Sequence, residues 1–140
     1  MSRIFWDTNV YIYLLEEFGR WSALTTDLRN KMLERGDQLM TSTLTLGEIL
    51  VKPMATGDSE LCRRYVKKLS EASALIPFDA EAAQRYAELR SDRSLRSPDA
   101  IQLACASVAR VDLFVTNDLR LQGKQVPGIQ FIVALDRVPI

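Results

Sequence analysis

Four acidic residues, spread along the chain, stand where a carboxylate could take part in chemistry: Asp7, Glu48, Asp99 and Asp118. Asp7 and Asp118 each follow a short apolar run typical of a buried strand, whereas Glu48 and Asp99 lie near the expected starts of helices. If the four carboxylates meet, they repel one another unless a cation lies among them. A divalent ion held by carboxylates keeps water ligands, can acidify one of them, and stabilises charge on a phosphoryl oxygen. The pattern therefore predicts metal-dependent hydrolysis of a phosphodiester.

Each acid also has a purely structural interpretation. Asp7 and Asp118 adjoin Thr and Asn, as helix caps and turn residues do. Glu48 completes a capping-box pattern that begins at Thr45, and Asp99 would suit the positive end of a helix dipole. The structural interpretation is favoured for each acid alone. The functional one is favoured for the four together, because convergence of four like charges calls for a cation.

Apolar runs of strand length alternate with segments of helical periodicity. We expect strands at residues 3–6, 38–41, 74–78, 113–116 and 129–135, helices after each of the first three, including one from 97 to 109, and a surface loop at 119–128 after the fourth. These runs are apolar throughout, which predicts a mainly parallel sheet of about five strands in a three-layer α/β/α sandwich. Open α/β sheets bind ligands at the carboxyl ends of their strands, so the four acids should share that edge.

Length and composition indicate one domain, residues 1–140. The chain has 140 residues and is 47% hydrophobic, enough for one core and too short for two ordinary domains. No apolar stretch approaches the roughly 20 residues that span a bilayer, and the start lacks a leader pattern, so we expect a soluble, cytoplasmic protein. Cys62 and Cys105 stand singly, which is typical of reduced thiols.

The absence of histidine narrows the possible chemistry most. With no histidine, the chain cannot form a Ser-His-Asp or Cys-His relay or a His-rich zinc or iron site, and two cysteines cannot form a four-cysteine zinc site. A metal must then be held by oxygen ligands, which favours Mg²⁺ or Mn²⁺.

The net charge is zero, so any contact with nucleic acid must be local. The stretch containing Arg90, Arg93 and Arg96 leads to Asp99 and could hold substrate phosphates. An equally favoured alternative is that these arginines merely belong to a solvated connection.

Four segments resemble the motifs of PIN-domain nucleases, in the family's order. They are Ile-Phe-Trp-Asp-Thr-Asn at 4–9, Thr-Leu-Thr-Leu-Gly-Glu-Ile-Leu at 43–50, Ser-Pro-Asp-Ala-Ile-Gln-Leu-Ala at 97–104, and Phe-Val-Thr-Asn-Asp at 114–118. The resemblance implies that Asp7, Glu48, Asp99 and Asp118 form the catalytic metal site. It also implies that Thr8, Asn9 and Thr116 orient ligands or water.

A PIN domain of this length is most similar to the VapC-type toxins of toxin-antitoxin pairs. That resemblance implies an endoribonuclease acting on RNA, a homodimer, and a cognate antitoxin protein as partner. A housekeeping RNA-processing nuclease and a non-catalytic interaction module remain alternatives.

Two other enzyme classes are excluded. A phosphotransferase of the haloacid-dehalogenase type would carry an Asp-x-Asp-x-Thr motif after the first strand. Here Asn9 stands in place of the second Asp and Tyr11 in place of the Thr. A nucleotide-binding domain would need a grouped Gly-rich phosphate loop, and the six glycines are scattered.

Overall fold

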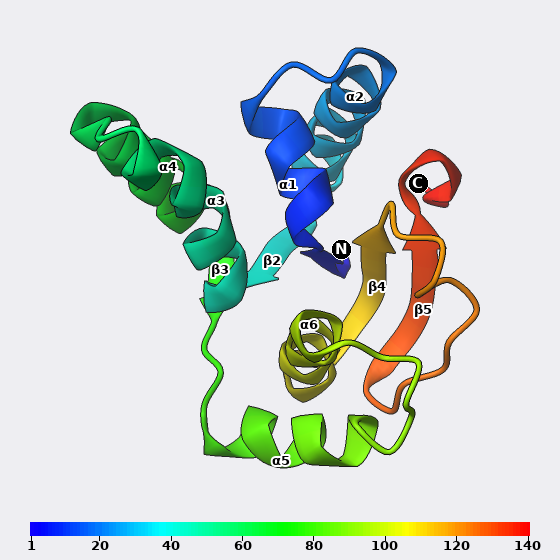
Figure 1. Cartoon of the computed structure of the whole chain (residues 1–140). Helices are drawn as coiled ribbons and strands as arrows, with labels where there is room; N and C mark the ends of the chain where they lie inside the picture. The colour runs from blue at the N-terminus through cyan, green and yellow to red at the C-terminus, as the bar shows by residue number, and fades with distance from the viewer.

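Five parallel strands form a single sheet in the order β3-β2-β1-β4-β5. The computed structural model describes residues 1–140 (Figure 1). The strands are β1 (Arg3–Trp6), β2 (Gln38–Ser42), β3 (Ala74–Ile76), β4 (Val111–Thr116) and β5 (Ile129–Ala134). The predicted parallel, about five-stranded sheet is confirmed, and every neighbouring pair is parallel.

Helices cover both faces of the sheet, which confirms the three-layer sandwich. They are α1 (Thr8–Leu15), α2 (Arg20–Arg35), α3 (Thr43–Ala55), α4 (Ser59–Ala72), α5 (Ala80–Leu89) and α6 (Ser97–Ala109), followed by a short 3-10 turn η1 (Leu135–Arg137). One core packs Ile4 and Trp6 of β1 beneath α1 to α4, and the other packs Phe5 beneath α5 and α6. This division follows from the strand geometry, because successive side chains point to opposite faces. None of these helices combines the length and the apolar character that a membrane span requires.

The helices start and stop largely where local signals predict. Gly36 ends α2 in the left-handed conformation, with φ of 73°. Asp58 caps α4 and Asp79 caps α5, each by accepting a hydrogen bond from a backbone N–H. The helix expected at Thr45 instead begins at Thr43, because Ser42 is its cap, and it continues through Pro53. Both cysteine thiols are free and buried.

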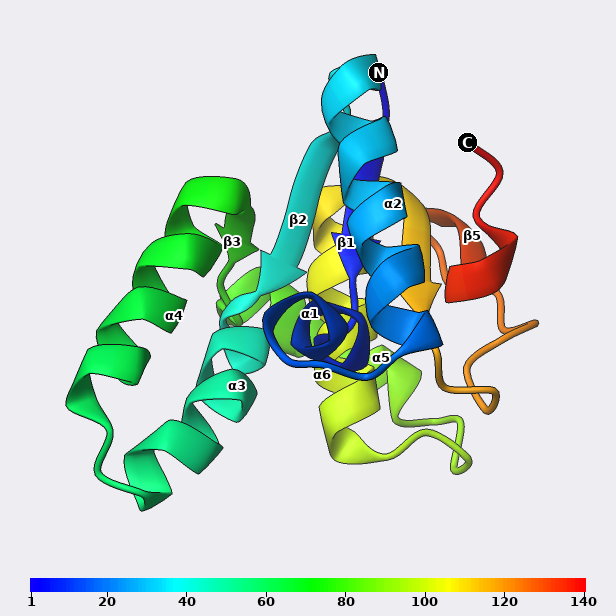
Figure 2. The same cartoon turned by 90° about the horizontal axis from the view of Figure 1, so that it is seen from above.

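The order of the strands places a topological switch point between β1 and β4. The chain winds from β1 to β2 and β3 on one side of the sheet, and β4 and β5 lie on the other side. In such a sheet the loops at the carboxyl ends of the two strands diverge at this reversal, which is where ligands bind. The paired helices α3 and α4 project to one side, next to β3 (Figures 1 and 2).

Candidate functional site

Asp7 lies at the carboxyl end of β1, next to β4. Its Oδ1 accepts a hydrogen bond from the backbone N–H of Thr8 at 2.8 Å, so the residue does cap α1. Its Oδ2 accepts from the hydroxyl of Thr116, the last residue of β4, at 2.8 Å. Asp7 is only 7% exposed. The capping interpretation is therefore confirmed for one oxygen, while the other joins Asp7 to the neighbouring strand.

The pKa of Asp7 is raised to about 6, from an ordinary value of 3.8. Burial is the main cause, and the hydrogen bonds from Thr116 and Thr8 oppose it. The negative charges of Asp99 and Glu48 raise the pKa further. Asp7 thus lies within electrostatic reach of two of the other three acids. A carboxyl group whose pKa is shifted by burial and by specific neighbouring charges is typical of a functional site.

Glu48 reaches the site through Thr8. Its Oε1 accepts a hydrogen bond from the Thr8 hydroxyl at 2.8 Å. The capping-box interpretation of Glu48 is wrong, because Ser42 and not Thr45 caps α3, which places Glu48 beyond the first turn. The carboxylate is therefore free to face α1 instead of its own backbone.

Gln102, which the sequence analysis missed, lies buried at the centre of this arrangement. Its Nε2 donates to the hydroxyl of Thr8 at 2.9 Å and to that of Thr45 at 2.8 Å, while its Oε1 accepts from the hydroxyl of Ser42. The amide thus joins α6 to α1 and α3. The available signal was its position three residues after Asp99 in a helix of otherwise small or apolar residues, because residues three apart share a helix face.

Asp99 and Asp118 form the outer part of the site, and both face arginines. Arg120, in the turn after β4, donates from Nε to Asp118 Oδ1 at 3.0 Å and from Nη2 to Asp118 Oδ2 at 2.6 Å. The same Nη2 lies 4.0 Å from Asp99 Oδ2. Arg96 Nε approaches Asp99 Oδ2 to 3.8 Å. Arg120 was not predicted as a site residue, since a single arginine in an exposed turn carries no distinctive local signal.

The two outer carboxyl groups differ in pKa. Hydrogen bonds from Arg120 lower the pKa of Asp118. Burial, followed by the charge of Asp118, raises the pKa of Asp99, although Arg120 and Arg96 oppose that rise. Asp99 lies in the first turn of α6, as expected, and Asp118 in the turn after β4.

The structure brings the four acids to one edge but does not assemble a ready set of metal ligands. No three acidic side chains surround one point closely enough to hold a metal ion. The donor chemistry does fit a hard divalent cation, since the four side chains offer only carboxylate oxygens and Asp7 is paired with no basic side chain. Metal binding by these four acids stays a prediction.

The remaining predicted residues divide into two groups. Thr116 and Thr8 hold carboxylates, and Arg96 lies beside Asp99. Asn9 instead accepts from the backbone N–H of Asn117 at 3.1 Å, which fixes the turn that carries Asp118. Arg93 is exposed and makes no ion pair or side-chain hydrogen bond, so the structure does not bring it to the acids.

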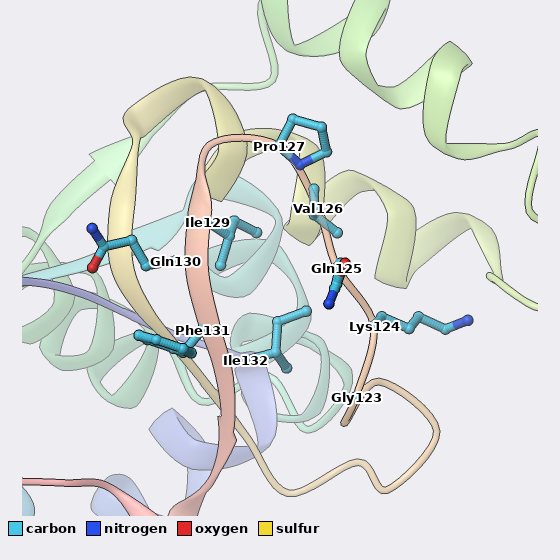
Figure 3. A pocket seen from close by; sticks show the side chains of 9 residues that line it. All are labelled: Gly123, Lys124, Gln125, Val126, Pro127, Ile129, Gln130, Phe131 and Ile132. Carbon is cyan, nitrogen blue, oxygen red and sulfur yellow. The ribbon is translucent and has the colours of Figure 1, made fainter.

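A surface hollow of roughly 640 Å³ lies elsewhere, along the edge strand β5. Figure 3 shows its walls, which are formed by residues 123–127 of the preceding loop and by β5 itself. Lys124 is the only charged side chain that lines it, and none of the predicted site residues does. The carboxyl ends of β1 and β4 therefore remain the candidate site.

Comparison with known proteins identifies the family. The PIN domain matches residues 4–125, a span that contains all four acids. The fold is similar to VapBC2 from Rickettsia felis bound to a promoter DNA fragment, with a TM-score of 0.74 and 15% identity over 94% of this chain and 98% of that one. A toxin-antitoxin complex from Klebsiella pneumoniae is similar with a TM-score of 0.65 and 26% identity, over 90% and 94% of the two chains. DNA-bound VapBC from Salmonella typhimurium is similar with a TM-score of 0.66 and 20% identity, over 96% of this chain and 99% of that one.

No curated protein matches the chain by sequence. The domain match nevertheless covers most of the chain, and the parallel sheet and the acids at the ends of β1 and β4 agree with it. The chain therefore belongs to the PIN-domain family of nucleases.

Proposed function

We propose that this protein is an endoribonuclease that hydrolyses RNA phosphodiester bonds with Mg²⁺ or Mn²⁺ held by Asp7, Glu48, Asp99 and Asp118. The observation that carries the proposal is the state of Asp7. This buried carboxyl group has a pKa of about 6, is repelled by the negative charges of Asp99 and Glu48, and forms no ion pair. A carboxylate oriented in this way but not neutralised gains more from a bound cation than an exposed one does.

The side chains around Asp7 orient the carboxylates. Thr8 N–H and the Thr116 hydroxyl hold one oxygen each of Asp7, which fixes the plane of the carboxylate. The Thr8 hydroxyl holds Glu48, and Gln102 holds Thr8 in turn. A bound divalent ion would supply an acidified water and neutralise charge on the phosphoryl group.

The arginines at the rim of the site suit a phosphate substrate. Arg96 and Arg120 are both exposed and lie beside Asp99 and Asp118. A guanidinium in this position can hold a backbone phosphate independently of base sequence. Asn9, which holds the turn carrying Asp118, contributes by positioning.

We also propose that the protein is the toxin of a type II toxin-antitoxin pair, works as a homodimer, and has a cognate antitoxin protein as partner. The likeness to toxin-antitoxin complexes over nearly the whole length of both chains supports this assignment. Exposed apolar side chains on α3 and α4, among them Val51, Met54 and Val66, offer surface to a protein partner.

Cleavage of a labelled single-stranded RNA tests the catalytic proposal. We expect cutting with Mg²⁺ or Mn²⁺ that is lost with EDTA and in Asp99→Asn. Asp27→Asn is the matched control, because Asp27 is an exposed acid on α2 whose only ion pair is with Lys31. Cutting of DNA but not RNA would overturn the substrate assignment. A folded protein that binds RNA but cuts none in any condition would be a non-catalytic module.

Controlled expression in a bacterial host tests the toxin proposal separately. We expect the wild-type protein to arrest growth and Asp7→Asn to permit it. RNA cleavage in the test tube without growth arrest would favour a housekeeping nuclease over a toxin.

A further inference from the structure

Arg120 turns its guanidinium back onto the acids of the site. It lies two residues after Asp118, and its side chain is half exposed, so solvent is open to it. It nevertheless pairs with both oxygens of Asp118 and approaches Asp99, which belongs to α6. The guanidinium thus bridges the turn after β4 and the start of α6.

This geometry places a positive charge on the oxygens that a metal ion would need. Each oxygen of Asp118 accepts a hydrogen bond from the guanidinium, in a fork that matches the carboxylate. Asp7, by contrast, has no cation beside it. The absence of a three-acid ligand set coincides with this engagement of the outer acids by Arg120.

We propose that Arg120 is an internal counter-ion that holds Asp118 and Asp99 in the metal-free protein and must release them before a divalent cation binds. The inference rests on the proposed metal site but not on the proposed substrate. A guanidinium and a divalent cation cannot both occupy the same carboxylate oxygens at close range, so each weakens the binding of the other. Release is feasible because the Arg120 side chain is 53% exposed, so water can take over its hydrogen bonds, whereas the Asp118 side chain is only 17% exposed and stays in place.

Titration of the metal-free protein with Mn²⁺, in the absence of RNA, tests the proposal by calorimetry. We expect Arg120→Gln to bind Mn²⁺ more tightly than wild type by a factor on the order of 3 to 10, because the competing charge is gone. Arg96→Gln should show a smaller gain, since Arg96 makes one long contact with Asp99 alone. Arg63→Gln is the control for net charge, because Arg63 is exposed on α4 and makes no ion pair, and its affinity should equal that of wild type.

Thermal unfolding with EDTA and with Mn²⁺ gives a second readout. We expect Arg120→Gln to be less stable than wild type with EDTA and to gain more from Mn²⁺, because removing the counter-ion leaves the outer acids unneutralised until metal binds. A merely structural ion pair would lower stability equally in both conditions.

The two proposals fail in different ways. If Arg120→Gln binds Mn²⁺ no more tightly than wild type and Arg63→Gln, the counter-ion proposal is overturned while the metal site stands. If neither wild type nor any variant binds Mn²⁺, the metal site is overturned and the counter-ion role with it.

Discussion

The hydroxyl network around Asp7 and the arginine rim around Asp118 hold carboxylates by different means. Around Asp7 the donors are neutral: a backbone N–H and the hydroxyl of Thr116, with Gln102 aligning Thr8 beside them. Around Asp118 the main donor is the charged guanidinium of Arg120. The pKa of Asp7 is accordingly raised and that of Asp118 lowered.

The difference shows that a carboxylate can be held in a fixed orientation, as Asp7 is, without having its charge neutralised, as that of Asp118 is. Neutral donors fix the direction of a buried carboxylate without cancelling its charge, so Asp7 keeps an unfavourable charge that a cation can relieve. A guanidinium cancels charge but can leave, because it is exposed on a flexible side chain. We therefore expect changes in the network to affect both stability and activity, and changes in the rim to affect mainly cation affinity.

Asp7→Asn should give the largest effect. We expect RNA cleavage to fall by a factor on the order of 10³, because the variant loses a carboxylate at the centre of the proposed metal site. The metal-free variant should be more stable than wild type at neutral pH, since the buried charge is removed while the amide oxygen can still accept from Thr8 N–H. Thermal unfolding with EDTA measures this gain, and a variant less stable than wild type at neutral pH would contradict it.

The stability gain of Asp7→Asn should depend on pH. The folded state holds the Asp7 proton with a pKa of about 6, above the ordinary 3.8. Protonated Asp7 therefore contributes stability that is fully present below the ordinary value and is lost as the pH rises through about 6. The difference between the two pKa values corresponds to roughly 3 kcal/mol at most. The stability difference between wild type and Asp7→Asn should follow this curve in urea unfolding series, and a pH-independent difference would contradict it.

Gln102→Leu should come next in size. We expect a loss of about 2–3 kcal/mol in the free energy of unfolding, because leucine leaves the hydroxyls of Thr8, Thr45 and Ser42 without their buried partner. Gln84→Leu is the matched control, since Gln84 is an exposed glutamine on α5 with no side-chain hydrogen bond. Equal losses in the two variants by urea unfolding would show that the network contributes nothing specific.

Thr116→Val should have the smallest effect on stability, about 1 kcal/mol, because one hydrogen bond to Asp7 and one from Asp118 N–H are lost. The pKa of Asp7 should rise above about 6, since the hydroxyl lowers it in wild type. Carboxyl NMR titration measures that pKa, and Thr116→Ser should retain the wild-type value. An unchanged pKa in Thr116→Val would mean that water replaces the hydroxyl.

Most elements could be predicted because their signals are local. Gly36 ends α2, Asp58 and Asp79 cap α4 and α5, and Ser97 opens α6, as short-range rules require. The start of α3 could not be placed, because Ser42 and Thr45 are both acceptable caps. Their contacts with Gln102 decide between them. The Thr45 hydroxyl oxygen accepts from the Gln102 amide, whereas the Ser42 hydroxyl donates to it and keeps its oxygen free to accept from the backbone N–H of Thr45.

The sequence by itself determined the edge of the sheet at which Asp7 and Asp118 lie, because residues that directly follow parallel strands emerge at the same edge. Only the tertiary structure decided their partners. Gln102 reaches Thr8 across 94 residues, and Thr116 reaches Asp7 across 109. Arg120 is close to Asp118 in sequence, but its approach to Asp99 depends on where α6 packs. Local spacing encodes which side chains share an edge, whereas packing of distant helices and strands sets which of them touch and how each charge is balanced.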